Sequence, residues 1–321
     1  MSLAFVFPGQ GSQAVGMGQA LAEAYPVARH TLEEVDDALG QKLSRLMLAG
    51  PEEELRLTAN AQPALMAVSM AVVRVLESEG NLRLTDKAAF VAGHSLGEYS
   101  ALAAAGSLQV ADTARLLRRR GQAMQEAVPV GEGAMAALLG LDLELAQAIA
   151  AEAVQALAAE AAGVQVCATA NDNAPGQVVI SGHTAAVERA CEIAKANGAK
   201  RAVLLPVSAP FHCSLMAPAA DAMAEALAAV TVVQPEIPLI ANVTASHLSD
   251  PDEIRRKLVE QVTGMVRWRE SVAYMAAQGV ETVIELGAGK VLTGLNKRID
   301  RALAAQGVET PQEVEAALAR L

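Results

Sequence analysis

Gly93-His94-Ser95-Leu96-Gly97 joins an apolar run, residues 88–92, to an alanine-rich segment, residues 98–105. The run predicts a strand and the segment predicts a helix, so the serine stands on a tight strand-to-helix turn. The flanking glycines lack the Cβ atoms that such a turn excludes. This context predicts a nucleophile elbow that raises Ser95 Oγ at the start of the helix, and the alternative is an ordinary turn with a capping serine.

Composition limits the class of protein. The chain has 321 residues, of which 52% are hydrophobic and 19% charged, so it can bury a large core. A net charge of -11 disfavours nucleic acid as a partner. Three cysteines without C-x-x-C spacing favour a reducing compartment and argue against disulfides or a metal site. The apolar start ends at Pro8-Gly9, too soon for a signal peptide or membrane span. We therefore expect a cytoplasmic protein that does not bind membranes.

Apolar runs alternate with helical periodicity along most of the chain, which favours a parallel sheet covered by helices. We expect an α/β-hydrolase-like large domain formed by residues 1–130 and 206–321, in which an amphipathic helix carries Pro63 in its first turn. Its strands are expected at residues 3–7, 88–92, 239–243 and 282–285, its helices at residues 62–79 and 252–262, and a capping box at Thr310 and Glu313 before a last helix.

The segment between these two parts has a different pattern. Residues 131–205 read as strand, helix, strand, strand, helix, strand, which is the order of a ferredoxin-like unit. We expect an inserted ferredoxin-like subdomain there. Its strands are expected at residues 134–140, 165–169, 177–181 and 201–205, and its helices at residues 143–162 and 184–197.

A glycine-rich turn, residues 7–13, follows the first strand. It satisfies a G-x-G-x-x-A dinucleotide pattern, but the second strand with its acidic residue is missing, because residues 26–39 look helical. We expect this turn instead to direct a backbone N–H toward Ser95. Together with the N–H of Leu96, it would form an oxyanion hole for an acyl intermediate.

Five histidines compete for the role of base. His94 adjoins the serine and would point away from it if the elbow is real. His212 lies in a turn-like segment, residues 207–214, where a catalytic and a structural role are equally consistent with the sequence. Cys213 is a weak rival nucleophile. The other histidines have polar surroundings typical of the surface: His30, His183 and His247.

Three arginines at residues 118–120 are expected to close a helix that begins near Ala111. Such a run is usually a solvated helix face close to the favourable C-terminal dipole. If one arginine turns inward, its planar fork is suited to bind a substrate carboxylate through two hydrogen bonds.

Five motifs carry a family resemblance: FPGQGSQ (7–13), GHSLGEYSAL (93–102), RGQAMQEA (120–127), PFHCSLM (210–216) and GAGKVLTG (287–294). With them the chain resembles the malonyl-CoA:acyl carrier protein transacylases over nearly its whole length. The resemblance implies transfer of a malonyl group from a coenzyme A thioester to acyl carrier protein through an ester on Ser95. It also implies that His212 acts as base and then as acid, that no cofactor is needed and that the protein is a monomer.

The resemblance implies further site residues. Arg120 would bind the malonyl carboxylate, the amides of Gln10 and Leu96 would form the oxyanion hole, and a backbone carbonyl of Gln261 would orient His212. The cleft would be lined by Asn171, Asn173 and Phe211. Phe211 stands where some related polyketide acyltransferases have serine, and the phenylalanine accompanies malonyl rather than methylmalonyl.

Several alternatives stay open at this point. The chain could serve fatty acid synthesis, a polyketide synthase or a malonate decarboxylase system. An esterase would share the elbow, but its histidine should lie near the C-terminus, and none follows His247. A non-catalytic scaffold would not need Ser95, His212 and Arg120 together. The basic clusters that could receive an acidic carrier protein are residues 200–201, 255–257 and 297–301.

Overall fold

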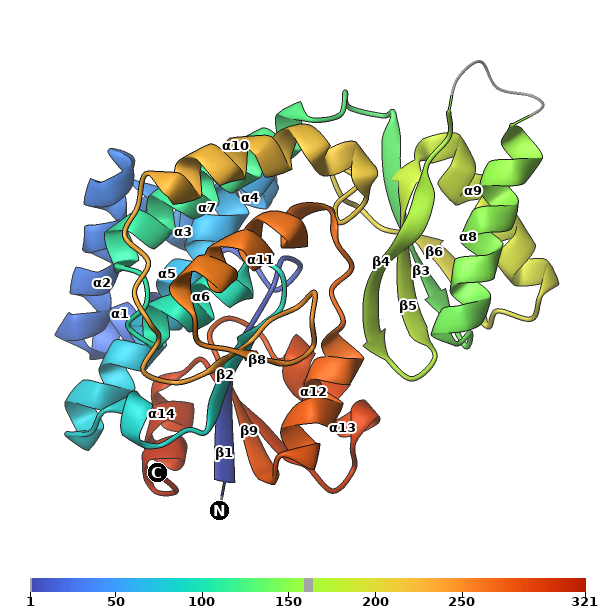
Figure 1. Cartoon of the computed structure of the whole chain (residues 1–321). Coiled ribbons are helices and arrows are strands. Elements are labelled where there is room, and N and C mark those ends of the chain that lie inside the picture. Colours follow the sequence, from blue (N-terminus) through green and yellow to red (C-terminus); the bar gives the residue numbers. More distant parts are fainter. Residues whose placement is uncertain (1, 159–163) are drawn as a thin grey trace.

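The strands of the computed structural model, which describes residues 2–158 and 164–321, form two separate sheets (Figure 1). The expected α/β fold class is confirmed, whereas the domain boundaries stay a prediction. The larger sheet contains, in spatial order, β10 (Ala304–Val308), β9 (Val280–Leu286), β1 (Ser2–Phe7), β2 (Phe90–Gly93), β7 (Leu239–Ile240) and β8 (His247–Leu248).

The central strand β1 shows how the larger sheet is buried on both faces. Its neighbours β2 and β9 are parallel to it, and only β8 pairs antiparallel. Side chains alternate along a strand, so Phe5 and Phe7 point to one face while Ala4 and Val6 point to the other. The first pair joins the main hydrophobic core, and the second pair joins a smaller core around Trp268. The continuous apolar sequence of β1 therefore reflects a strand covered on both sides.

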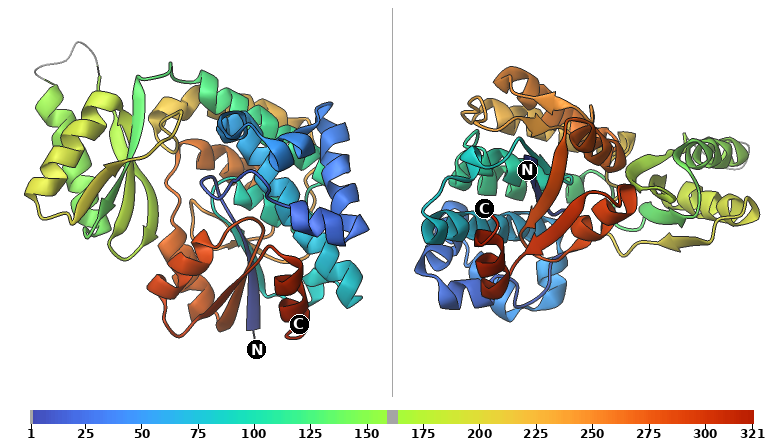
Figure 2. Two further views of the ribbon diagram at one scale, coloured as in Figure 1. Left: turned by 180° about the vertical axis from the view of Figure 1, so that it is seen from behind. Right: turned by 90° about the horizontal axis from the view of Figure 1, so that it is seen from below.

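Helices cover the two faces of this sheet (Figures 1 and 2). The smaller core lies under α12 (Trp268–Ala277) and α13 (Val291–Ile299), and the main core lies under α5 (Thr58–Gly80) and α6 (Gly97–Ala104). The remaining helices are α1 (Gln19–Ala24), α2 (Pro26–Leu39), α3 (Leu43–Ala49), α4 (Glu52–Arg56), α7 (Val110–Glu126), α10 (Ala217–Ala228), α11 (Pro251–Thr263) and α14 (Pro311–Leu318), with 3₁₀ turns at Leu84–Asp86 and Ser214–Met216.

Helix α5 differs from the expected amphipathic helix. It begins at Thr58, so Pro63 lies in its second turn, and it is buried on nearly all sides as far as Leu76. By length and composition α5 resembles a membrane span, but 89% of its apolar window is buried inside the protein. Its apolar surface is thus covered by the protein itself, as in the core helix of a soluble protein.

The smaller sheet has the strand order of a ferredoxin-like unit. All its pairs are antiparallel, and α8 (Leu143–Leu157) and α9 (Thr184–Ala196) pack on the face that carries Ala136 and Leu138. Residues 159–162 of the expected first helix lie outside the described residues. We call residues 133–204 the small unit and the rest the large unit. In spatial order the strands are β4 (Cys167–Ala174), β5 (Gln177–His183), β3 (Gly133–Leu139) and β6 (Arg201–Leu204).

The two units are joined where β4 meets the segment that follows α11. The amide of Val266 donates to the carbonyl of Ala170, and the amide of Asp172 donates to the carbonyl of Val266, both at 2.9 Å. The buried carboxylate of Asp172 also accepts a hydrogen bond from Arg269 at 2.8 Å. These contacts fix the small unit beside the C-terminal ends of the large sheet's parallel strands.

Two local expectations have clear outcomes, and one strand was not expected. The capping box of Thr310 and Glu313 is confirmed at the start of α14. The three arginines do not close a helix, because α7 continues to Glu126, so the expected dipole interaction is wrong. The edge strand β10 was not expected, since its sequence, Ala-Ala-Gln-Gly-Val, has little β propensity.

Gly121 of α7 lies in close contact with the start of α5. A Cβ at this position would lie 2.6 Å from both Ala59 Cα and Thr58 O. We expect Gly121→Ala to lower the free energy of unfolding by ~1–3 kcal/mol, because the helices must separate. The control is Gly294→Ala on α13, where an added Cβ meets nothing within 4 Å and helix propensity improves. Urea denaturation followed by circular dichroism measures both, and an equally stable Gly121→Ala variant would contradict this packing.

Candidate active site

Ser95 sits on a turn that only glycines can flank. Its φ is +52°, in the left-handed region. A Cβ on Gly93 would lie 1.9 Å from the carbonyl group of Gly97, and a Cβ on Gly97 would lie 2.2 Å from the oxygen of Phe7. The strand–turn–helix geometry expected from the sequence is therefore present, with Ser95 between β2 and α6.

Asn242, two residues after the end of β7, supports this turn. The amide of Ser95 donates to Asn242 Oδ1 at 2.8 Å, and Asn242 Nδ2 donates to the carbonyl of Gly93 at 2.7 Å. The carboxyl ends of adjacent parallel strands meet at one edge of a sheet, which brings Asn242 to the elbow although 147 positions separate it from Ser95. Its place directly after an apolar run was the only signal in the sequence.

His212 is positioned as a neutral base beside the serine. Its Nε2 lies 2.8 Å from Ser95 Oγ, and its Nδ1 lies 2.9 Å from the carbonyl oxygen of Gln261 and 3.0 Å from that of Gly264. Carbonyl oxygens only accept, so Nδ1 carries the proton and Nε2 is free to accept from the serine hydroxyl. Burial, with the nearby charge of Arg120, lowers the pKa of His212 to about 3.

Arg120 is a buried cation whose hydrogen-bond acceptors are all neutral. It is 1% exposed, and Arg119 beside it is exposed. Nη1 donates to Gln62 Oε1 at 2.8 Å, and Nη2 donates to Gln261 Oε1 at 2.7 Å and to Ser95 Oγ at 3.0 Å. Within the described residues no ion pair includes Arg120. A buried charge without an ionic partner is costly, so this guanidinium is suited to receive an anion.

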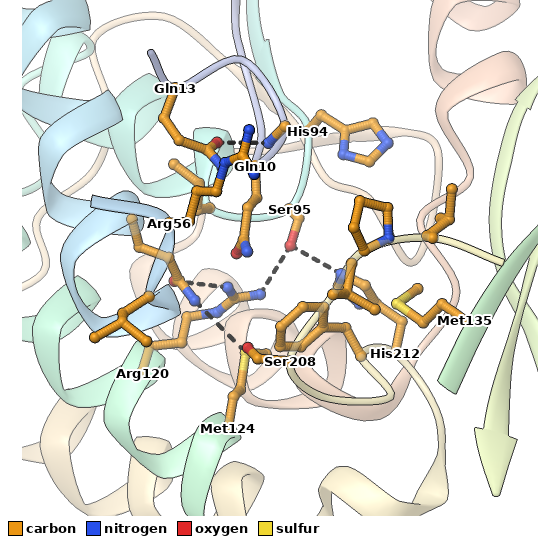
Figure 3. Close-up of a pocket in the computed structure, with 18 of the residues that line it drawn as sticks. Gln10, Gln13, Arg56, His94, Ser95, Arg120, Met124, Met135, Ser208 and His212 are labelled. Atoms are coloured by element: carbon orange, nitrogen blue, oxygen red, sulfur yellow. Dashed lines mark hydrogen bonds between the residues drawn. The ribbon is translucent and has the colours of Figure 1, made fainter. Parts of the chain in front are cut away.

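These side chains converge on one cavity of about 590 Å³ between the two units. Figure 3 shows Ser95 near its centre, with Arg120 on one side, His212 on the other and Gln10 nearby. The walls come from the N-terminal turn, from α4, from the segment after β6 and from the small unit. The residues that line it include Gln10, Ser95, Leu96, Arg120, Asn171, Phe211 and His212.

Of the three other residues expected to line the cleft, two line the cavity and one lies elsewhere. Asn171 and Phe211 line the cavity, but Asn173 does not. Asn173 Oδ1 instead lies 2.9 Å from Nε2 of His94, whose ring points away from Ser95 (Figure 3). The expectation for Asn173 is therefore wrong. Pairing register along β4 shifts between Thr169 and Asn171 and again between Asp172 and Ala174, so simple alternation does not hold there.

The N-terminal turn is supported from behind by the last motif. A Cβ on Gly287 would lie 3.0 Å from Pro8 Cγ, and one on Gly289 would lie 3.2 Å from Ser12 Cβ. The amides of Gln10 and Leu96 donate to no protein acceptor in the part of the chain that the structure describes. Both residues line the cavity, which leaves these donors free for a substrate oxygen, and their oxyanion role stays a prediction.

Three further polar residues of the site were missed from the sequence. Gln62 of α5 accepts from Arg120, and the ring of Tyr99 lies 5.7 Å below the guanidinium. Glu98 is buried beside Gln261 and Asn242. Glu98 and Tyr99 directly follow the elbow glycine, but nothing in the helical pattern indicated that a glutamate would be buried.

Because the pKa of His212 is lowered in the folded protein, we expect the protein to lose stability as the pH falls. The unfolded chain binds a proton at this residue near pH 6.5 and the folded chain does not, so its contribution to stability is present above pH 6.5 and declines as pH falls toward 3. Between pH 7 and pH 5, we expect the wild type to lose about 2 kcal/mol more unfolding free energy than His212→Gln. The control is His30→Gln, at an exposed position on α2. Equal losses in wild type and His212→Gln, measured by urea denaturation, would contradict the assignment.

Known proteins of one family are similar to this chain in sequence and in fold. A family model described as an acyl transferase domain matches residues 4–310. The chain is similar to the malonyl CoA-acyl carrier protein transacylase of Escherichia coli K12, with 51% identity over 315 residues and 98% of each chain covered. It is also similar to the crystal structure of an acyl-carrier-protein S-malonyltransferase from Bartonella henselae, with a TM-score of 0.94 and 57% identity over 100% of this chain and 99% of that one.

A further solved relative was determined together with a carrier protein. It is a malonyl-transacylase in complex with a type II PKS acyl-carrier protein, with a TM-score of 0.94 and 44% identity over 100% of both chains. The similarity therefore extends over the whole chain in sequence and in fold.

Proposed function

Since this chain belongs to the acyl transferase domain family, we propose that it transfers a malonyl group from malonyl-CoA to the phosphopantetheine thiol of acyl carrier protein, in fatty acid synthesis. The observation that carries the proposal is Arg120: a buried guanidinium, 3.0 Å from the nucleophilic oxygen, whose acceptors are all neutral. An acyl group with its own carboxylate supplies the missing anion.

In the first half-reaction Ser95 Oγ attacks the thioester carbonyl of malonyl-CoA. The hydroxyl proton passes to His212 Nε2, which lies 2.8 Å away and is unprotonated. The carbon–sulfur bond then breaks, His212 returns the proton to the coenzyme A sulfur, and a malonyl ester remains on Ser95. The carbonyls of Gln261 and Gly264 hold the imidazole in the required tautomer and take the place of a carboxylate.

The second half-reaction runs the same steps with the carrier. The pantetheine thiol gives its proton to His212, its sulfur attacks the ester carbonyl, and Ser95 leaves with the proton returned from His212. Because one thioester replaces another, the energy difference is small, and the main requirement is to keep water from the ester. We infer that the chain needs no cofactor, because Ser95, His212 and Arg120 supply the nucleophile, the base and the cation.

The amides of Gln10 and Leu96 stabilise the negative charge that develops on the carbonyl oxygen during the reaction. Leu96 precedes the first turn of α6, so its N–H and the positive end of the helix lie at the same place.

When the malonyl carboxylate arrives, Arg120 exchanges its bond to Ser95 Oγ for bonds to that carboxylate, which frees the nucleophile. The ring of Phe211 narrows the same cavity, which favours an unbranched malonyl group.

We also propose which biosynthetic pathway uses the loaded carrier protein. The sequence relatives are named for acyl carrier protein, and one structural relative was solved with a type II PKS carrier, so fatty acid synthesis is our first candidate and a polyketide system the second. We propose a cytoplasmic location, where coenzyme A thioesters are made. Docking of the carrier protein at residues 200–201, 255–257 or 297–301 stays a prediction. The first of these clusters is connected to the site, because Arg201 begins β6 and the segment that follows β6 lines the cavity.

Competition between two thioesters tests the proposal. After brief incubation with equimolar malonyl-CoA and acetyl-CoA, intact-protein mass should show a malonyl adduct in the wild type and none in Ser95→Ala. Arg120→Ala should reduce the preference for malonyl by about 30-fold or more, because losing a buried charge partner costs ~2–5 kcal/mol. The matched control, Arg119→Ala, alters the exposed neighbour on α7 and should keep the preference. Equal malonyl and acetyl adducts in the wild type would refute the proposal.

A further inference from the structure

Glu98 is a buried carboxyl group that the reaction described above does not use. It is 1% exposed and lies in the first turn of α6. Its Oε2 accepts hydrogen bonds from the amide of Asn242 at 3.0 Å and from Gln261 Nε2 at 2.9 Å. A carboxyl group in this position needs a compensating charge if it is ionised.

The charge that compensates ionised Glu98 is that of Arg120, and the side-chain amide of Gln261 connects the two groups. Gln261 accepts from Arg120 with Oε1 and donates to Glu98 with Nε2, so its side chain lies between the cation and the carboxyl group. No other ionised partner is in contact with either group among the described residues. Burial raises the pKa of Glu98 to about 7, and its hydrogen bonds with Gln261 and Asn242 and the charge of Arg120 oppose that rise.

The other titratable groups that face this pair are neutral near pH 7. Tyr99 of α6 is buried, and its pKa is raised to about 12. Burial lowers the pKa of His212 to about 3, and it also lowers that of His94. Among the described residues, the hydrogen bonds to the carboxyl group itself come from the backbone amide of Asn242, in the loop after β7, and from the side-chain amide of Gln261, in helix α11. Arg120 and Glu98 are thus the charged groups of this buried hydrogen-bonded cluster, and Glu53 and Arg56 line the cavity from α4.

We propose that Glu98 is a positioning residue that acts through Gln261: it balances the charge of Arg120 before substrate binds, and it takes up a proton from solvent when the malonyl carboxylate binds Arg120. This inference rests on the proposed function, in which Arg120 receives that carboxylate. Two carboxylates beside one guanidinium leave one negative charge uncompensated in a buried site, and the proton removes it. Acetyl brings no charge, so its transfer requires no such proton.

The proposal predicts how malonyl binding depends on pH. Above pH 7 Glu98 is ionised before substrate binds, so one proton must be taken up with each malonyl group. The half-saturating concentration of malonyl-CoA in single-turnover acylation of Ser95 should then rise by up to about tenfold per pH unit, relative to acetyl-CoA. Using acetyl-CoA as the reference cancels ionisation of the coenzyme A phosphate, which both substrates share.

Glu98→Gln tests the assignment, because it keeps the shape and an acceptor oxygen but cannot ionise. Its malonyl-to-acetyl ratio should not change between pH 7 and pH 8.5, and its half-saturating malonyl-CoA concentration at pH 8 should be several-fold below that of the wild type. The matched control is Glu285→Gln: Glu285 is also fully buried, but it accepts from Leu292 and Thr293 at the start of α13. This control should keep the wild-type pH dependence.

A second measurement needs no variant. In weakly buffered solution at pH 8, a pH indicator should report uptake of up to one more proton per serine acylated by malonyl-CoA than by acetyl-CoA. Equal proton counts, or an unchanged pH dependence in Glu98→Gln, would overturn this inference and leave the proposed function intact. If instead Arg120→Ala kept the full preference for malonyl, the proposed function itself would fail.

Discussion

The structure of this site depends on keeping the charge of Arg120 out of water without an adjacent carboxylate. Close contact of α7 with α5 at Gly121 brings the neighbouring arginine under the elbow, where Gln62 and Gln261 orient its two terminal nitrogens. Neutral amides hold the guanidinium in place, and the buried carboxyl group of Glu98 reaches it only through the side-chain amide of Gln261. The site is therefore suited to a ligand that carries its own negative charge, and this is the basis of the proposed preference for an acyl group with a carboxylate.

The same amides connect the cation to the nucleophile. Gln261 donates to the carbonyl of Ser95 with its side chain and accepts from His212 with its backbone, while Asn242 holds the amide of Ser95. Asn242 lies in the loop after β7, His212 in the turn before the 3₁₀ segment Ser214–Met216, and Gln261 in the last turn of α11. The segment after α11 also pairs with β4, so the small unit supports the loop whose Gly264 carbonyl orients His212. The geometry of the base thus depends on both units together.

The site residues that could be predicted from the sequence are those whose local context is unusual. Ser95 stood between two glycines on a strand-to-helix turn, and His212 was the histidine in a turn after the last small-unit strand. The inward member of the arginine run could not be chosen from spacing and came from the family resemblance. Gln62 and Asn242 act through amide contacts between segments far apart in sequence, which leave no local pattern. Local patterns also misplaced the start of α5 and missed β10, because tertiary packing and an edge position overrode weak propensities there.

A crystal structure of the protein acylated by malonyl-CoA, determined before the carrier is added, tests the central claim most directly. The account predicts an ester on Ser95 whose carboxylate accepts hydrogen bonds from both terminal nitrogens of Arg120, with the ester carbonyl oxygen at the amides of Gln10 and Leu96. In that structure Arg120 should no longer donate to Ser95 Oγ. A malonyl carboxylate directed into solvent, with Arg120 still bound to its neutral acceptors, would contradict the account.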